Sequence, residues 1–183
     1  MKEFVITCQD DLKQFKVKDG YEFNGDLNVS EYNDTFKLEG KLKVNGDLLS
    51  EDGWPIEIKG SIVVSGQIYC VGDIKADGYI EVGDKVTTNG YIKAKEYIEC
   101  CGELNAGEYI KAGEYIKSAG DLVSDDDIKA GLYITCKGIL DCGEECFAGL
   151  CISRETSDEE KTITCGKLEN GVIKHGILKE IGM

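Results

Sequence analysis

An aliphatic residue recurs at every sixth position from Ile62 to Ile152, without a slip in phase. Cys146 is the one member of this series that is not aliphatic. An α-helix repeats after about 3.6 residues and a strand alternates, so neither an amphipathic helix nor a simple hairpin meander explains this period. Such a period is typical of a solenoid, in which each short strand stacks on the strand one coil below it.

A period of 18 residues lies inside this pattern, because an alanine stands two residues after every third aliphatic position. The repeated segments read Asp73-Ile-Lys-Ala, Tyr91-Ile-Lys-Ala, Tyr109-Ile-Lys-Ala and Asp127-Ile-Lys-Ala. Side chains alternate along a strand, so the isoleucine and alanine of each segment are expected to point inward and the lysine outward. The sequence therefore predicts an all-β fold, a three-sided parallel β-helix in which one chain winds with 18 residues per coil.

The column is expected to occupy residues 15–152 of a single domain and to contain about seven coils. Inward pairs begin with Phe15 and Val17, and insertions interrupt the phase near residues 30–35 and 49–54. Glycines recur at the corners, Gly72 and Gly90 among them, where we expect a positive φ. Unpaired strand edges invite aggregation, so we expect an N-terminal cap at residues 1–14, and a charged loop with a C-terminal cap at residues 153–183.

The winding is expected to be right-handed, which is the general preference of crossover connections. The small inward residue also follows the aliphatic one by two places, whereas the left-handed hexapeptide acyltransferases carry theirs further along. The segment Gly72-Asp-Ile-Lys-Ala-Asp-Gly-Tyr-Ile-Glu-Val and its repeats through Gly131 resemble the bactofilins in repeat style, over about residues 56–152. That resemblance implies a compact right-handed triangular β-helix and a cytoskeletal protein that forms polymers.

The chain carries a formal net charge of −14 and no apolar run long enough for a membrane span. Its first residues do not read as a signal peptide, so a cytoplasmic location and reduced cysteines are expected. Five of the nine cysteines fall on inward positions, where the thiol acts as a small apolar filler: Cys70, Cys100, Cys136, Cys142 and Cys146. No histidine or CxxC pair accompanies them, so neither a metal site nor a cofactor is predicted.

Acidic residues gather at one corner of the predicted column. They are Asp73, Glu108, Asp125, Asp126, Asp127, Glu144 and Glu145. One interpretation is that they keep a stack of coils soluble and monomeric by repulsion. The other is that a ridge of carboxylates on a rod of duplex-like width imitates a nucleic-acid backbone. Such a ridge would bind a protein partner, for example a basic nucleic-acid-binding protein.

A second candidate surface combines lysine and tyrosine at one-coil spacing. Its members are Lys75, Lys93, Lys111 and Lys129, with Tyr79, Tyr97, Tyr115 and Tyr133 on the next face. Lysine stems that cover apolar surface and aromatic rings that stack on strands explain this pattern without any partner. As a functional surface it would be a binding face or a homo-oligomer interface, because tyrosines are enriched in interface cores. The overall acidity argues against direct binding of nucleic acid.

An enzymatic function is not expected. The one histidine, His175, lies outside the regular coils, so the chain lacks the base that hexapeptide acyltransferases use. No nucleophile-elbow, zinc-protease, phosphate-loop or calcium-loop motif is present. We therefore expect a non-enzymatic acidic solenoid that binds a protein partner, in its specific form a phage-type inhibitor or nucleic-acid mimic. The alternative is a bactofilin-like scaffold that polymerises through its column ends.

Overall fold

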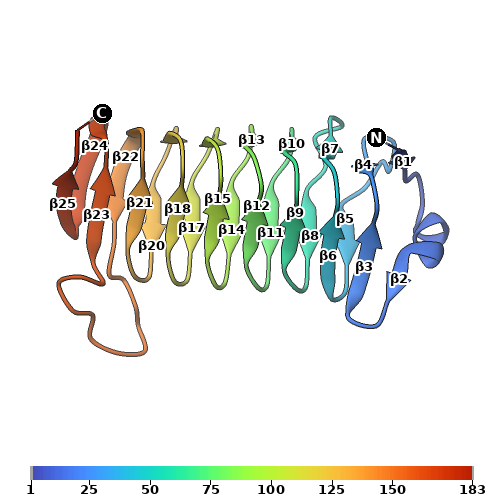
Figure 1. Cartoon of the computed structure of the whole chain (residues 1–183), viewed down its shortest axis with the longest axis horizontal. Helices are drawn as coiled ribbons and strands as arrows, with labels where there is room; N and C mark the ends of the chain where they lie inside the picture. The colour runs from blue at the N-terminus through green and yellow to red at the C-terminus, as the bar shows by residue number, and fades with distance from the viewer. Residues whose placement is uncertain (1, 183) are drawn as a thin grey trace.

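A computed structural model describes residues 2–182 as one column of stacked β-strands (Figure 1). Within these residues the only helix is η1, a 3-10 helix at Gln9–Phe15. Parallel neighbours in the regular part of the column lie 18 positions apart, as in the pairs of Ile74 with Ile92 and of Ile92 with Ile110. The predicted all-β parallel solenoid with 18 residues per coil is confirmed. The hand of its winding stays a prediction.

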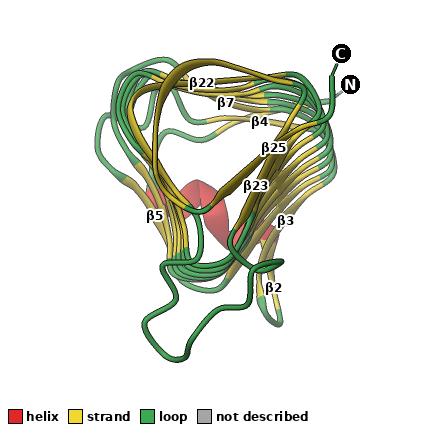
Figure 2. Ribbon diagram, turned by 90° about the vertical axis from the view of Figure 1, so that its left-hand side faces the viewer, coloured by secondary structure: helices red, strands yellow, loops and turns green. Residues whose placement is uncertain are grey.

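Seen along its axis the column has three sides (Figure 2). Face 1 consists of β1 (Glu3–Val5), β4 (Asp26–Asn28), β7 (Leu48–Ser50), β10 (Ile68–Cys70), β13 (Val86–Thr88), β16 (Leu104–Ala106), β19 (Leu122–Ser124) and the first part of β22 (Ile139–Phe147). Face 2 consists of β5 (Phe36–Leu38), β8 (Ile56–Ile58), β11 (Ile74–Ala76), β14 (Ile92–Ala94), β17 (Ile110–Ala112), β20 (Ile128–Ala130) and the last part of β22.

Face 3 consists of β3 (Gly20–Phe23), β6 (Lys41–Val44), β9 (Ile62–Val64), β12 (Ile80–Val82), β15 (Ile98–Cys100), β18 (Ile116–Ser118), β21 (Ile134–Cys136), β23 (Thr162–Cys165) and β25 (Ile177–Glu180). The strand β2 (Lys16–Val17) pairs antiparallel with β3. The strand β24 (Lys167–His175) pairs with β22 from Ile139 to Phe147, so it extends face 1 and face 2 together. Face 3 has seven of these strands within residues 15–152, the range for which about seven coils were expected, and β23 and β25 beyond it bring the column to about nine coils.

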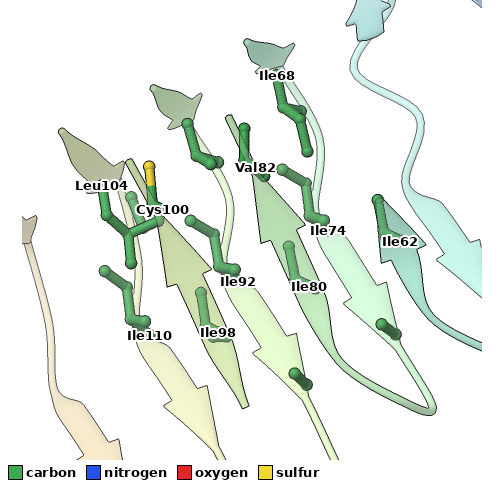
Figure 3. Packing of buried hydrophobic residues seen from close by; sticks show 14 of the residues in the cluster. Ile62, Ile68, Ile74, Ile80, Val82, Ile92, Ile98, Cys100, Leu104 and Ile110 are labelled. Atoms are coloured by element: carbon green, nitrogen blue, oxygen red, sulfur yellow. The ribbon is translucent and has the colours of Figure 1, made fainter. Parts of the chain in front are cut away.

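Columns of identical side chains fill the interior. Ile74, Ile92 and Ile110 are stacked in register and fully buried, and Figure 3 shows them in one row that points into the column. A second buried column beside them contains Ala94 and Ala112. Burying an aliphatic side chain of this size stabilises the fold by about 1.5–3 kcal/mol relative to leaving it exposed. The inward stacking that the 18-residue period predicts is confirmed.

Close stacking, and not a positive φ, requires glycine at the corners. Neither Gly72 nor Gly90 has a positive φ, so that expectation is wrong. A Cβ atom at Gly72 would lie 2.6 Å from the carbonyl oxygen of Gly53, and one at Gly90 would lie 2.2 Å from Asp73 Oδ1. Positive φ values occur outside the 18-residue repeat, as at Gly53 in the second insertion and at Gly149 before the C-terminal loop.

The N-terminal end of the column is covered. Leu12 of η1 is buried. The ring centroid of Phe15 lies 4.9 Å from that of Phe4 and 4.2 Å from that of Phe23. The expectation that Phe15 and Val17 form the first inward pair is wrong. Phe15 ends the helix, and Val17 is exposed because the antiparallel hairpin of β2 and β3 turns it away from the column.

The coils lengthen where the two insertions lie. Leu27 pairs with Leu48, 21 positions on, and Leu48 pairs with Ile68, 20 positions on. The extra residues are therefore placed at corners, and the strands on either side keep their register.

The C-terminal end differs from the N-terminal end. The phase is lost after Ala148, and Ile152, expected on the last inward position, is fully exposed on a loop at residues 148–161. That loop extends to one side of the column near its C-terminal end (Figure 1). Beyond it, β24 and β25 pair on one edge only within the described residues, and their inward side chains Leu168 and Leu178 are only partly buried.

Candidate functional site

The seven acidic residues singled out above all lie along the corner that joins face 1 to face 2. Asp73 follows β10, Glu108 follows β16, and the run from Asp125 to Asp127 follows β19. Glu144 and Glu145 lie where β22 bends from face 1 to face 2. We call these seven residues the acidic corner. The other two corners also carry acidic residues, Glu96 and Asp84 among them, so the negative charge is not confined to this one.

Two aspartates of the acidic corner have structural roles. Asp73 Oδ1 accepts a hydrogen bond of 3.2 Å from the backbone N–H of Tyr91, and Asp127 Oδ1 accepts one of 3.1 Å from Glu145, each one coil further on. Asp127 Oδ2 also lies 2.5 Å from the ammonium of Lys129. An unpaired backbone N–H at a buried corner is costly, so these carboxylates stabilise the stacking of coils.

The remaining carboxylates of the acidic corner are largely free. Glu108, Asp125, Asp126 and Glu144 are exposed, and none has a cationic side chain of the described residues within 4.0 Å. Glu145 lies 2.9 Å from Lys174. The four free carboxylates occupy three consecutive coils, and strands of neighbouring coils are about 4.8 Å apart. Like charges at such spacing repel one another, so a cation would relieve the repulsion.

The lysine ladder lies directly beside the acidic corner. Lys75, Lys93, Lys111 and Lys129 are in register along face 2, one on each of four successive strands. Lys75 is 3.8 Å from Glu57, whereas Lys93 and Lys111 have no carboxylate of the described residues within 4.0 Å. A surface depression of about 320 Å³ lies between the ladder and the acidic corner; it is lined by Lys93, Tyr109, Lys111, Asp126, Asp127, Lys129 and Glu144. The two candidate surfaces therefore share an edge.

The tyrosine ladder belongs to a different edge of the column. Tyr79, Tyr97, Tyr115 and Tyr133 stack with ring centroids 4.8–5.0 Å apart at the corner between face 2 and face 3. Their hydroxyls contact side chains of face 3: Tyr97 donates to Glu81 Oε1 at 2.5 Å, and Tyr115 to Glu99 Oε2 at 3.4 Å. Burial and the Glu99 carboxylate raise the pKa of Tyr115 to about 12.

The hydroxyls of Tyr97 and Tyr115 therefore contact face 3 and not the lysines of face 2. The lysine ladder and the tyrosine ladder are not joined through these hydroxyls. The rings of Tyr91 and Tyr109, 4.8 Å apart, lie next to the lysines instead. On face 3, the ammonium of Lys117 lies 4.5 Å from the ring of Tyr115 and 5.8 Å from the ring of Tyr133. These are intramolecular contacts that hold the tyrosine rings in place.

The inward serine and cysteine residues have a role that the period alone does not reveal. Ser118 Oγ lies 2.8 Å from the carbonyl oxygen of Gly102, a corner residue one coil below. Cys100 Sγ has the same contact with Asp84 at 2.8 Å, and Cys142 Sγ has it with Asp126 at 3.2 Å. The carbonyl oxygens of Gly102 and Asp84 also accept a backbone N–H from the next coil, so the side chain adds a second hydrogen bond at these corners.

All five cysteines predicted to point inward are buried, and Cys165 is buried with them. Burial raises the pKa of Cys70 and of Cys100 to about 11, and that of Cys136 to about 12. These thiols are thus kept in the neutral, hydrogen-bonding form. At the surface, Cys8 and Cys101 are exposed.

The histidine of the chain, His175, ends β24 and lies outside the regular coils. His175 Nδ1 lies 2.5 Å from the backbone carbonyl oxygen of Ala148, a contact that joins β24 to the start of the loop. Among the described residues no group of three or more His, Cys, Asp or Glu side chains is placed to hold a metal ion. No helix in the described part of the chain is long and apolar enough to cross a membrane.

Comparisons with models of protein families, with curated proteins and with solved structures gave no match for this chain.

Proposed function

We propose that this chain is a non-enzymatic interaction protein that binds a basic protein partner through its acidic corner. The observation that carries the proposal is the set of four exposed carboxylates on three consecutive coils, Glu108, Asp125, Asp126 and Glu144, without a cation of the described chain beside them. A groove rich in arginine or lysine on a partner would relieve their repulsion. In the more specific form of the proposal, the partner binds nucleic acid and the corner takes the place of the phosphate backbone, as in a phage-type inhibitor.

The rigidity of the corner supports this proposal. Asp127 fixes the backbone next to Glu144 by accepting a hydrogen bond from the N–H of Glu145, and Asp73 makes the same contact with Tyr91 further along the corner. A pre-ordered set of charges loses less conformational entropy on binding than a flexible acidic tail does. The net charge of −14 would also speed the encounter with a cationic partner at low salt.

The test replaces three of the four free carboxylates and spares the carboxylates with structural roles. The triple variant Asp125→Asn, Asp126→Asn, Glu144→Gln is compared with a matched variant that removes three charges from the other two corners: Asp84→Asn, Glu96→Gln, Glu114→Gln. The probe is a fluorescent oligoarginine peptide, titrated at low and at physiological salt. We expect binding that weakens as salt rises, and a loss of about tenfold or more in affinity for the first variant only. An equal loss in both variants would mean that net charge alone attracts the probe and that the corner is not a site.

The alternative function is a bactofilin-like scaffold that assembles through its column ends. The observation that favours it is the uncovered C-terminal end, where β24 and β25 have a free edge within the described residues. The covered N-terminal end, where Leu12 of η1 is buried, argues against long filaments and favours pairs of molecules. Sizing chromatography with electron microscopy separates the two functions, because a scaffold would form filaments and an interaction protein would elute as a discrete species.

A further inference from the structure

A hollow lies at the corner between face 2 and face 3, near the C-terminal end of the column. The first corner position after each face 2 strand holds Asp77 and Lys95 in two coils, but Gly113 and Gly131 in the next two. A Cβ atom at Gly113 would lie 1.9 Å from the carbonyl oxygen of Lys95, so close stacking keeps this position free of side chains. The surface there consists of backbone and of the short side chains next to it.

The loop at residues 148–161 forms a wall beside this hollow. Its first residues are held against the coil below, since Gly149 N–H donates to the carbonyl of Leu132 at 2.6 Å and Leu150 N–H to that of Ala130 at 3.2 Å. Its far part is braced by Arg154, whose guanidinium lies 2.8 Å and 2.5 Å from the two carboxylate oxygens of Glu160. A loop of this length without regular structure is uncommon in a compact domain unless it has a function.

The loop leaves two aliphatic side chains in water. Ile152 is fully exposed and Leu150 is 40% exposed, both at the mouth of the hollow. The resulting cavity, of about 580 Å³, has the size of many small-molecule pockets (about 300–1,000 Å³). Its lining is mostly apolar: Ala112, Gly113, Ala130 and Gly131 below, and Leu150 and Ile152 at the side.

Cys151, Ser153 and three lysines complete the lining, in a protein whose net charge is −14. Lys95 is paired with Asp77 at 3.0 Å and Lys129 with Asp127 at 2.5 Å. Lys111, between them, has no carboxylate of the described residues within 4.0 Å. The cavity therefore combines an apolar surface with an unneutralised ammonium group.

We propose that this cavity binds an amphiphilic anion, specifically a linear aliphatic carboxylate. The chain of the ligand would cover Ile152 and Leu150, and its carboxylate would pair with Lys111. A simple inorganic anion would leave the aliphatic side chains in water, and a neutral or cationic amphiphile would leave Lys111 unpaired. Lys111 and Lys129 also border the acidic corner, but none of the seven acidic residues lines this cavity, so the proposal does not depend on the function proposed above.

The first test is calorimetric titration of the full chain with sodium decanoate, below its micelle concentration, and with decylammonium chloride. The two ligands share the aliphatic chain and differ in the sign of the head group. We expect saturable binding of decanoate at one site and at least about tenfold weaker binding of decylammonium. Equal affinities would overturn the proposal, because they would show that the lysines take no part, and so would the absence of decanoate binding.

Four single variants test where decanoate binds. Ile152→Ser and Lys111→Gln change exposed residues of the cavity, and each is expected to weaken decanoate binding by about tenfold. Lys93→Gln is the matched control, since it lies one coil away in the same ladder and outside this cavity. Leu178→Ser tests the uncovered C-terminal end as an apolar alternative. Loss of binding in Leu178→Ser with no change in Ile152→Ser would place decanoate at the column end and overturn the proposal.

Discussion

At the scale of the residue, the fold depends on a small side chain two positions after each inward aliphatic residue. Ala112 is buried in register between Ala94 and Ala130. Replacing Ala112 with Leu should lower the free energy of unfolding by about 1–3 kcal/mol, because no space is left for a larger side chain. Asn105→Leu, an outward position, is the control and should change stability by about 0.5 kcal/mol or less. Urea unfolding measures both, and equal effects would contradict the inward placement.

The inward serines make a second prediction possible at this scale. Ser118 Oγ lies 2.8 Å from the carbonyl oxygens of Gly102 and of Asp121. Each of these oxygens also accepts a backbone N–H, from Gly120 at 3.0 Å and from Leu104 at 2.9 Å. Ser118→Ala should therefore cost about 0.5–1.5 kcal/mol of unfolding free energy, the ordinary net contribution of one hydrogen bond. Ser118→Cys should cost less, because Cys100 performs the same role one coil below. If the alanine variant is as stable as the natural chain, the hydrogen bond of the Ser118 hydroxyl makes no net contribution to stability.

The buried thiols predict how stability depends on pH. Burial raises the pKa of Cys100 to about 11 from an ordinary value of 9.0, so the folded chain keeps a proton that the unfolded chain releases. This contribution is complete below about pH 9 and is lost as the pH rises from about 9 to about 11. Cys100→Ser should therefore lose less stability between pH 8 and pH 10.5 than the natural chain does, to be measured by urea unfolding at both values. An identical loss would show that Cys100 does not titrate on unfolding.

At the scale of the element, the six-residue period predicts strand positions well and corner contacts poorly. Each inward aliphatic residue of the 18-residue repeat, such as Ile92, pairs with the equivalent residue one coil away. The period alone therefore predicts which residues form a strand, which side chains point inward and which strands are neighbours. The period breaks near both ends, where Val17 turns outward in a hairpin and Ile152 in a loop. The reason for each corner glycine also lies outside the local sequence, because the atom that would clash belongs to the coil below.

For the candidate sites too, the sequence predicts the positions of residues but not their contacts. Fixed spacing places the acidic corner and both ladders on their edges of the column. The spacing does not show that the Asp127 carboxylate contacts Lys129 and the backbone N–H of Glu145, because those contacts depend on the backbone conformation of the corner. The cavity beside Ile152 was not predictable, since the loop that forms it has no repeat. Its one sequence signal is the loss of phase before the charged segment at residues 153–161.

The acidic corner gives a prediction at the scale of this element. Three of its four free carboxylates, Asp125, Asp126 and Glu144, lie on two neighbouring coils. Converting these three to Asn, Asn and Gln should raise the thermal midpoint at low salt, because it removes repulsion that the folded state concentrates. The gain should shrink at high salt, where the repulsion is screened. Differential scanning calorimetry at two salt concentrations measures this, and a lower midpoint in the variant would show that the carboxylates have stabilising contacts.

At the scale of the whole molecule, the two ends of the column are unlike. The first coil is covered by η1, with Leu12 buried in it, whereas the last coil leaves the edges of β24 and β25 unpaired within the described residues. An uncovered strand edge invites another strand. We expect two molecules to join through their C-terminal ends, because η1 covers the N-terminal end, where β1 and β5 are paired on one edge only within residues 2–182. Such a contact closes on itself, so it should stop at a dimer.

This asymmetry predicts that the N-terminal cover limits assembly. Leu12→Asp should release η1 by placing a carboxylate in an apolar site, and so expose the edge of the first coil. With both ends free, molecules should add end to end and sediment as long assemblies, whereas the natural chain should remain a monomer or dimer in analytical ultracentrifugation. Leu12→Met, which keeps the apolar contact, should behave as the natural chain. Circular dichroism must show that Leu12→Asp keeps its β-structure. Filaments formed by the natural chain itself would contradict this account, because growth past a dimer needs two open ends.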